Sequence, residues 1–280
     1  MGLFKLIKKY DKHLCKNRKM IFYETISNQV FYNYFIKRKR DKKQTKLVIF
    51  DKDGTLINNE KIFAPWVEKI VFELNKNYGF SSNDLFKHLG YNKENKMFSG
   101  NSIVARGTND DIRNSINNFI ISSNKNFNTI DAKEIINKIW CDISFNENNV
   151  IPFGNLNDIF EKLKKKNIKI AVCTSDDRNC TLKMLNILKV KHLIDKIVCG
   201  NDDISSKPSP EPIWKICNSL DILPSETIMI GDTIADIQSG INSRCGQIYG
   251  VLSGGYSSNY LKDGDKIFNN INEAVDYITK

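Results

Sequence analysis

LVIFDKDGT (residues 47–55) joins a short apolar run to an acidic turn. The apolar run has the length and composition of a buried strand. Just past the end of a strand, residues two apart can face the same way, so the Asp51 and Asp53 carboxylates can point to one spot. Two crowded carboxylates repel each other, and a bound cation is the usual remedy. Gly54 permits the tight turn that such a loop needs, and Thr55 offers a hydroxyl and a backbone N–H to a phosphate.

Taken alone, such an acidic pentapeptide is more often an ordinary turn, but it is the first of four segments with related features. The other three combine an apolar run, a proline-rich turn or a helix start with polar or charged side chains: residues 169–175, with Thr174 and Ser175; residues 206–212, with Lys207; and residues 228–236, with Asp232 and Asp236. In order, spacing and residue types, the four segments closely resemble the signature motifs of the haloacid dehalogenase superfamily. The resemblance extends from Leu47 to about Ile278, and most members of this superfamily are Mg²⁺-dependent phosphatases.

From Leu47 onward, strand-like runs alternate with helical patterns, which predicts parallel βαβ units. The expected strands are 47–50, 168–173, 196–199, 227–230 and 247–251. The expected helices between and after them are 156–165, 178–188, 211–220, 234–242 and 272–278. The fold class is therefore α/β, a Rossmann-like parallel sheet with helices on both faces.

Residues from about 57 to 150 break this alternation, because apolar residues such as Trp66, Ile70 and Leu74 recur at helical spacing without clear strands. In the haloacid dehalogenase superfamily, an insertion after the first motif forms a helical cap over the active site. The resemblance thus implies a core of residues 47–57 and 150–280, with an inserted α-helical cap domain at 58–149. Residues 90–108 look like the cap loop of the phosphoglycolate-phosphatase-like branch.

The resemblance also implies catalytic roles for the first motif. Asp51 is the expected nucleophile, whose attack on phosphorus gives an aspartyl-phosphate and divides one difficult displacement into two easier ones. Asp53 is the expected general acid and base, which protonates the leaving group and then activates the attacking water. Because the dehalogenases that name the superfamily lack an acid at the second position, Asp53 favours phosphoryl chemistry.

Three residues are expected to bind the phosphate. The Thr174 hydroxyl can donate to a phosphoryl oxygen, and Ser175 can assist through its backbone N–H. Lys207 supplies a positive point charge for the phosphate and the crowded carboxylates. The prolines around Lys207 restrict its backbone, whereas an isolated lysine is usually a solvated surface residue.

A Mg²⁺ ion is the expected cofactor, because oxygen-only ligands suit a hard cation. The implied ligands are Asp51, the backbone carbonyl of Asp53, and Asp232. Asp236 lies one helical turn after Asp232 and shares its helix face. It can bind the metal through water, hold Lys207, or simply complement the helix dipole as a first-turn acid.

The expected function is hydrolysis of a small phosphomonoester, phosphoglycolate-like or a sugar phosphate, so the expected partner is a small phosphorylated metabolite. Arg106, Lys87, His88 and Trp66 are candidate substrate readers in the cap, although each is more often an ordinary cap residue. One alternative is a phosphomutase of the β-phosphoglucomutase type, whose cap carries a His soon after the first motif. No His occurs here between Asp51 and His88. Phosphonate hydrolysis through a cap lysine, and a non-enzymatic docked scaffold, are further alternatives.

Most of the positive charge lies at the start of the chain. Of the 42 Lys and Arg and 32 Asp and Glu, residues 1–46 hold 14 and 3, so the remainder is close to neutral. Charge confined to one end argues against nucleic-acid binding by the core and predicts a separately acting basic N-terminal extension, 1–46. This extension fits a mitochondrial-type targeting peptide in contact with import machinery, a helix at an anionic membrane surface, or a solvated tail.

The cysteine pattern and the lengths of the apolar runs favour some cellular compartments over others. Seven scattered cysteines without a CxxC pair predict a reducing compartment, and three histidines without a Cys/His cluster argue against a zinc site. The sequence contains no run of about 18 or more apolar residues, so it predicts no membrane span. The expected location is the cytoplasm, with a mitochondrion or another organelle as the alternative if residues 1–46 are a targeting segment.

Overall fold

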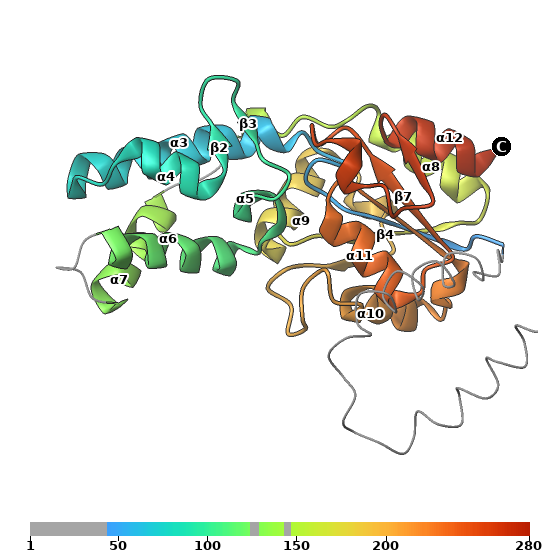
Figure 1. Ribbon diagram of the computed structural model, residues 1–280. Helices are drawn as coiled ribbons and strands as arrows, with labels where there is room; N and C mark the ends of the chain where they lie inside the picture. The colour runs from blue at the N-terminus through green and yellow to red at the C-terminus, as the bar shows by residue number, and fades with distance from the viewer. Residues whose placement is uncertain (1–43, 124–128, 143–146) are drawn as a thin grey trace, which may run out of the picture. The chain divides into compact units, whose positions relative to one another are not determined.

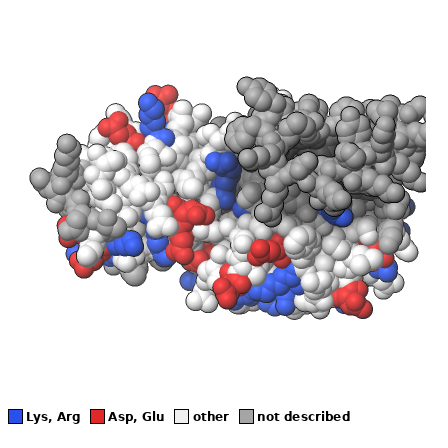
Figure 2. Space-filling view, turned by 60° about the horizontal axis from the view of Figure 1, so that its bottom comes forward, with Lys and Arg blue, Asp and Glu red and all other residues white. Residues whose placement is uncertain are grey.

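The computed structural model describes residues 44–123, 129–142 and 147–280 (Figure 1). Of the basic extension expected at 1–46, only the last three residues are described, and the roles suggested for the rest lie outside the described residues. In the described part of the chain, no helix is both long and apolar enough to cross a membrane. On the face shown in Figure 2, lysines and arginines are interspersed with acidic side chains over the described residues.

The described residues form a central sheet of six parallel strands in the order β5-β4-β1-β6-β7-β8. The strands are β1 (Leu47–Phe50), β4 (Lys169–Cys173), β5 (Lys196–Val198), β6 (Thr227–Gly231), β7 (Gln247–Val251) and β8 (Lys266–Phe268). The last residue of the inner strand β1, Phe50, pairs with Val172 of β4 and Ile230 of β6. This register brings the carboxyl ends of three neighbouring strands together.

Helices cover both faces of the sheet, as predicted (Figure 1). They are α8 (Leu156–Lys165), α9 (Arg178–Ile187), α10 (Glu211–Leu220), α11 (Ile234–Ser243) and α12 (Ile271–Thr279). Val48 and Phe50 of β1 pack in one apolar cluster with α8, α9 and α12, whereas Leu47 and Ile49 pack in another with α10 and α11. Because alternate side chains of β1 enter different cores, the whole strand is apolar.

A second group of helices lies between β1 and α8: α3 (Asn59–Tyr78), α4 (Ser82–Leu89), α5 (Ile103–Arg106), α6 (Asn109–Ser123) and α7 (Thr129–Asp142). Their apolar side chains form a separate cluster, which also takes in Tyr256 from the loop after β7. The two connecting segments lie side by side, because the Asn58 N–H donates to the Ile151 carbonyl at 2.8 Å. These helices are referred to below as the cap. Its limits at 58 and 149, and its status as a domain, stay predictions.

The first two cap helices begin and end at residues suited to helix ends. The Asn58 side chain accepts a hydrogen bond from the Lys61 N–H at the start of α3, and the Ser81 hydroxyl accepts one from the Asp84 N–H at the start of α4. Gly79 follows α3 in the left-handed conformation, with φ of 74°. The chain therefore leaves the first motif directly into a well-defined helix.

Two expectations about strands are corrected. The cap contains a short antiparallel hairpin, β2 (Tyr91–Asn92) and β3 (Met97–Phe98), where no strand was expected. The sheet also has an edge strand, β8, that was not expected. Both strands of the hairpin have two residues, and β8 has three that are largely exposed, so none shows an apolar pattern. Short 3₁₀ turns occur at Glu147–Asn149, Lys191–Leu193, Pro224–Glu226 and Ser258–Tyr260.

Candidate active site

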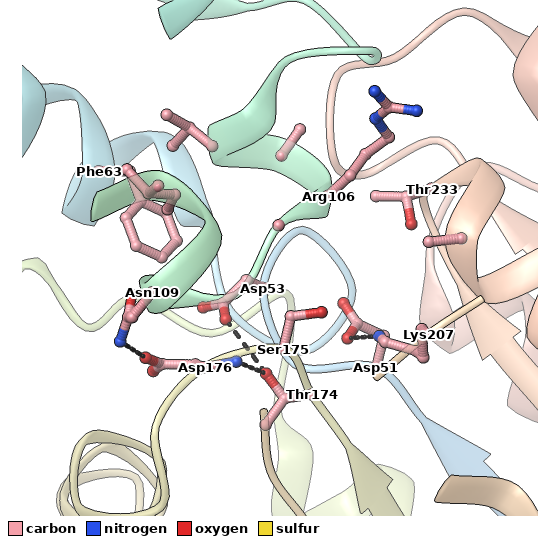
Figure 3. A pocket seen from close by; sticks show the side chains of 15 residues that line it. Asp51, Asp53, Phe63, Arg106, Asn109, Thr174, Ser175, Asp176, Lys207 and Thr233 are labelled. Atoms are coloured by element: carbon pink, nitrogen blue, oxygen red, sulfur yellow. Dashed lines mark hydrogen bonds and ion pairs between the residues drawn. The ribbon is translucent and has the colours of Figure 1, made fainter. Parts of the chain in front are cut away.

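The predicted site residues meet where β1, β4 and β6 end, and Figure 3 shows five of them: Asp51, Asp53, Thr174, Ser175 and Lys207. Asp51 directly follows β1, and its N–H donates to the Ile230 carbonyl of β6 at 2.8 Å. Thr174 directly follows β4, and Asp232 directly follows β6. All three side chains are buried. Open α/β sheets bind ligands at the carboxyl ends of their strands, so this is the expected place for a site.

Lys207 connects the first motif with the last. Its Nζ donates to Asp51 Oδ1 at 2.5 Å, to Asp236 Oδ1 at 2.6 Å and to the Cys173 carbonyl at 3.1 Å. The ammonium thus uses all three of its protons. Burial acts to lower the pKa of Lys207, but the Asp236 and Asp51 carboxylates raise it well above its ordinary value. Lys207 is therefore a fixed positive charge beside Asp51.

Asp236 contacts Lys207 and Thr233, and these contacts correspond to two of the roles suggested for it from the sequence. Its Oδ1 accepts from Lys207, while its Oδ2 accepts from the Thr233 N–H at 3.0 Å and the Thr233 hydroxyl at 2.6 Å. The second contact caps the start of α11. Asp236 therefore orients Lys207 from a helix start whose own geometry it fixes.

Asp232 is the carboxylate that fits a cation. It is fully buried, and its Oδ1 accepts from the Thr55 hydroxyl at 2.9 Å. Its Oδ2 has no hydrogen-bond partner within the described residues, which is costly for a buried oxygen. Asp51, Asp232 and Asp236 each offer an oxygen within 4.8 Å of the others. A hard cation would satisfy these oxygens, and the residues present therefore suit Mg²⁺.

Two glycines leave room around the unpartnered oxygen. A Cβ atom at Gly54 would lie 2.1 Å from Asp232 Oδ2, and one at Gly254 would lie 2.0 Å from it. Burial, together with the nearby Asp51 and Asp236 carboxylates, raises the pKa of Asp232 well above its ordinary value. Burial likewise raises the pKa of Asp51 to about 7, although Lys207 acts to lower it. The crowding of negative charge inferred from the sequence is present.

Asp53 is held by contacts different from those of Asp51. Its Oδ1 accepts from Lys52 Nζ at 2.6 Å, and its Oδ2 lies 3.5 Å from the Thr174 hydroxyl, at the long limit of a hydrogen bond. Its side chain is 17% exposed. Burial raises the pKa of Asp53 although the Lys52 ammonium lowers it. A carboxyl group with a raised pKa can act as an acid nearer neutral pH.

A small pocket lies between these residues and the cap, with a free volume of ≈ 30 Å³. The predicted residues Asp51, Asp53, Thr174, Ser175 and Lys207 all line it (Figure 3). The cap side is formed by the following residues: Phe63, Val104, Ala105, Arg106, Gly107, Asn109 and Ile112. A volume of this order holds one or two waters. The free space in the pocket is therefore small.

The four cap candidates differ in position. Arg106 lines the pocket, but in Figure 3 its guanidinium points away from the Asp51 and Asp53 carboxylates. Trp66 lines an adjoining hollow. Lys87 and His88 line neither, and the His88 ring is hydrogen-bonded to Ser115 within the cap at 2.9 Å. Only Arg106 and Trp66 lie near enough to the pocket to be candidates.

Two charged residues of the site, Lys52 and Asp176, were not predicted from the sequence. Lys52 is fully buried, and its Nζ lies 2.6 Å from Asp53 Oδ1 and 3.0 Å from Asp176 Oδ2. Burial acts to lower the pKa of Lys52, but Asp176 and Asp53 raise it. Asp176, two residues after Thr174, lines the pocket. A signal was available in the sequence: Lys52 lies within the first motif and Asp176 directly follows the second, so each is adjacent to a residue already assigned to the site.

Comparisons with known proteins agree with this geometry. A family model described as haloacid dehalogenase-like hydrolase matches residues 48–249. Pyrophosphatase PpaX of Bacillus mycoides (strain KBAB4) is 29% identical over 201 residues, covering 70% of this chain and 79% of the relative. Phosphoglycolate phosphatase of Aquifex aeolicus (strain VF5) is 27% identical over 198 residues, with coverage of 70% and 79%.

Solved structures share the fold. A predicted phosphoglycolate phosphatase from Haemophilus somnus 129PT has a TM-score of 0.63 at 19% identity, covering 84% of this chain and 98% of that one. A haloacid-dehalogenase-superfamily hydrolase of subfamily IA from Geobacter sulfurreducens PCA has a TM-score of 0.57 at 16% identity, covering 84% and 96%. The fold agrees with the family match, which spans more than half of the sequence. This chain belongs to the haloacid dehalogenase-like hydrolase family.

Proposed function

We propose that this protein is a Mg²⁺-dependent phosphatase that hydrolyses a small phosphomonoester through an aspartyl-phosphate on Asp51. The observation that carries the proposal is the pairing, at one pocket, of a buried carboxylate, Asp51, with a partly buried one, Asp53, in different surroundings. Asp51 bonds Lys207, whereas Asp53 bonds Lys52 and lies beside Thr174. Two acids in unlike environments can divide the roles of nucleophile and acid.

In the first step, Asp51 attacks phosphorus and the bond from phosphorus to the leaving oxygen breaks. Lys207 occupies Asp51 Oδ1, which leaves Oδ2 for the attack. Asp53 gives its proton to the leaving oxygen, so the alcohol departs neutral. The Thr174 hydroxyl, the Ser175 N–H and the Lys207 ammonium offset the charge of the phosphoryl oxygens.

In the second step, water attacks the phosphorus of the aspartyl-phosphate. Asp53, now deprotonated, accepts a proton from that water. The bond between phosphorus and the Asp51 oxygen breaks, which releases inorganic phosphate and restores the carboxylate. Asp53 therefore begins and ends the cycle as an acid, and its orientation matters in both steps.

The residues that would hold Mg²⁺ are Asp51, Asp232 and the backbone carbonyl of Asp53, with Asp236 behind them. When bound, the ion supplies positive charge that offsets the crowded carboxylates and the substrate phosphate. The unpartnered Asp232 oxygen supports this assignment. So does the room left beside it by Gly54 and Gly254.

The substrate that we propose is a small phosphorylated metabolite. The small free volume of the pocket and the cap residues that line it support a small leaving group. Two relatives are named for pyrophosphate and phosphoglycolate, both compact anions. Phosphoglycolate is the reference substrate of this proposal, and pyrophosphate belongs in the same test.

Phosphate release tests the proposal. We would compare the wild type with Asp51→Asn on phosphoglycolate, pyrophosphate and several sugar phosphates, with Mg²⁺ or with EDTA. Asp203→Asn is the matched control, because Asp203 is an exposed aspartate. Release that requires both Asp51 and Mg²⁺ is the expected result. A stable phosphoenzyme that turns over only with a sugar bisphosphate would identify a mutase instead. If there is neither phosphate release nor labelling of the protein, a non-enzymatic role would be favoured.

A further inference from the structure

A buried lysine beside the pocket is not used by the proposed mechanism. Lys52 is fully buried, and its Nζ contacts Asp53 Oδ1 at 2.6 Å, Asp176 Oδ2 at 3.0 Å and Met184 Sδ at 3.2 Å. It makes no contact with Asp51, which is bonded by Lys207 instead. Each of the two catalytic carboxylates therefore has a lysine of its own.

Asp176 is connected to both oxygens of Asp53. The first connection runs through Lys52 Nζ to Asp53 Oδ1. The second runs through Thr174, whose hydroxyl accepts from the Asp176 N–H at 3.1 Å and lies 3.5 Å from Asp53 Oδ2. A carboxylate restrained at both oxygens has little freedom to rotate. Asp53 is therefore oriented by the loop after β4.

The same aspartate reaches the cap. Asp176 Oδ1 accepts from Asn109 Nδ2 at 3.2 Å, and Asn109 is the first residue of the cap helix α6 (Figure 3). Asp176 Oδ1 also accepts from the Asp177 N–H at 2.7 Å. Contacts thus run without interruption from the cap to the proposed acid and base.

The energetic cost of burying Lys52 favours a role in orienting other residues over a general contribution to the stability of the fold. Removing an ammonium from water is expensive, and a buried ion pair commonly does no more than offset that cost. An apolar residue would fill the same space more cheaply. What the charged pair does provide is direction, because Lys52 must point at both Asp53 and Asp176 for its burial to be tolerated.

We propose that Lys52 and Asp176 are positioning residues for Asp53, and that Asn109 completes this arrangement from the cap. Asp53 then takes its working orientation when the cap is docked over the pocket. The inference rests on the proposed function, in which Asp53 gives a proton to the leaving oxygen. Misplacing a reacting group by about 1 Å can cost on the order of 10²-fold in rate, so such an arrangement matters.

The leaving group separates positioning from a merely structural role. Phosphoglycolate releases an alkoxide that needs the proton of Asp53, whereas para-nitrophenyl phosphate releases a stabilised phenolate that needs it far less. The ratio kcat/KM reports steps up to release of the alcohol. A variant that only displaces Asp53 should therefore lose kcat/KM on phosphoglycolate and retain it on the aryl ester.

The test compares Asn109→Ala and Asp176→Asn with two matched controls, all with Mg²⁺. Asn118→Ala removes an exposed asparagine from the same helix α6, and Asp177→Asn removes the neighbouring charge from the same loop. We expect kcat/KM on phosphoglycolate to fall about 10-fold for Asn109→Ala and about 10²-fold for Asp176→Asn, as part of the roughly 10²–10⁴-fold contribution of a general acid. On para-nitrophenyl phosphate both should stay within about 3-fold of the wild type, and the controls should match the wild type on both compounds.

Equal losses on the two compounds, or no loss in either test variant, would overturn the positioning role while leaving the phosphatase proposal intact. A wild type that hydrolyses neither compound with Mg²⁺ would overturn the proposed function itself. If Asp176→Asn does not fold, Asn109→Ala still decides, because Asn109 is only half-buried at the start of its helix. Thermal unfolding of each variant shows whether it folds.

Discussion

Replacing Asp232 by asparagine should stabilise the metal-free protein while removing its response to Mg²⁺. The Asp232 carboxylate is fully buried, its Oδ2 has no partner within the described residues, and Asp51 and Asp236 lie close enough to repel it. Asparagine keeps the shape and still accepts from the Thr55 hydroxyl. It carries no charge, so both the desolvation cost and the repulsion disappear.

The size of the effect has an upper bound. A buried carboxyl can always escape its cost by taking up a proton, and its ordinary pKa is 3.8. At pH 7, protonation of such a group costs roughly 4 kcal/mol, at 1.36 kcal/mol per pKa unit. We expect Asp232→Asn to gain between about 1 and 4 kcal/mol, the lower figure being typical of an unsatisfied buried polar group. Each kcal/mol raises Tm by about 2–4 °C in a chain of this size.

Mg²⁺ should stabilise the wild type but not the Asp232→Asn variant. An ion that binds only the folded wild type stabilises it by about 2.7 kcal/mol at 100 times its Kd. Thermal unfolding in EDTA and over a Mg²⁺ titration measures both effects, with Asp203→Asn as the control for removal of an exposed carboxylate. A lower Tm of Asp232→Asn in EDTA would show that Asp232 does not destabilise the metal-free protein, and an equal Mg²⁺-dependent rise in Tm in both proteins would show that it does not bind the ion.

Three further outcomes are expected. In EDTA, the free energy of unfolding should decrease as pH rises from about 4 to about 7. Burial raises the pKa of Asp51 to about 7, so the folded state binds an extra proton only below that pH. Urea unfolding over a pH series measures this decrease. Gly254→Ala should weaken the Mg²⁺-dependent rise in Tm, because its Cβ would lie 2.0 Å from Asp232 Oδ2 and must displace that carboxylate. Lys207→Met should abolish phosphate release. It should also lower the free energy of unfolding, measured by urea unfolding, by about 3–5 kcal/mol, because it leaves Asp51 and Asp236 buried without their counter-charge.

The sequence predicted the sheet well because strands covered on both faces are continuous apolar runs. The five predicted strands agree with the observed bounds to within one residue, and helices α8 and α10 agree at both ends. Parallel pairing then brings the residues that follow β1, β4 and β6 together, so Asp51, Thr174 and Asp232 could be assigned to one place in advance. The β2–β3 hairpin and β8 could not be predicted, because two or three residues are too few for a period to be recognised.

The contacts of Lys52 and Asp176 were not predicted from the sequence for a different reason. Both lie in acidic turns whose composition is typical of solvated loops, and a lysine in such a turn is normally exposed. Adjacent strands bring the two turns together, but a residue's neighbours in the chain do not determine which charges pair. That choice depends on the direction of each side chain, which only the folded packing around Met184 and Asp53 defines.

The pairing that results agrees with the place of the proposed cation. Each buried lysine bonds two of the carboxylates around the pocket: Lys52 bonds Asp53 and Asp176, and Lys207 bonds Asp51 and Asp236. Within the described residues, Asp232 has no lysine and is bonded only by the Thr55 hydroxyl. A divalent cation next to Asp232 would therefore supply the missing positive charge, and it would share only Asp51 with Lys207. It would leave the contact between Lys52 and the Asp53 side chain in place, because the ligand proposed from Asp53 is its backbone carbonyl.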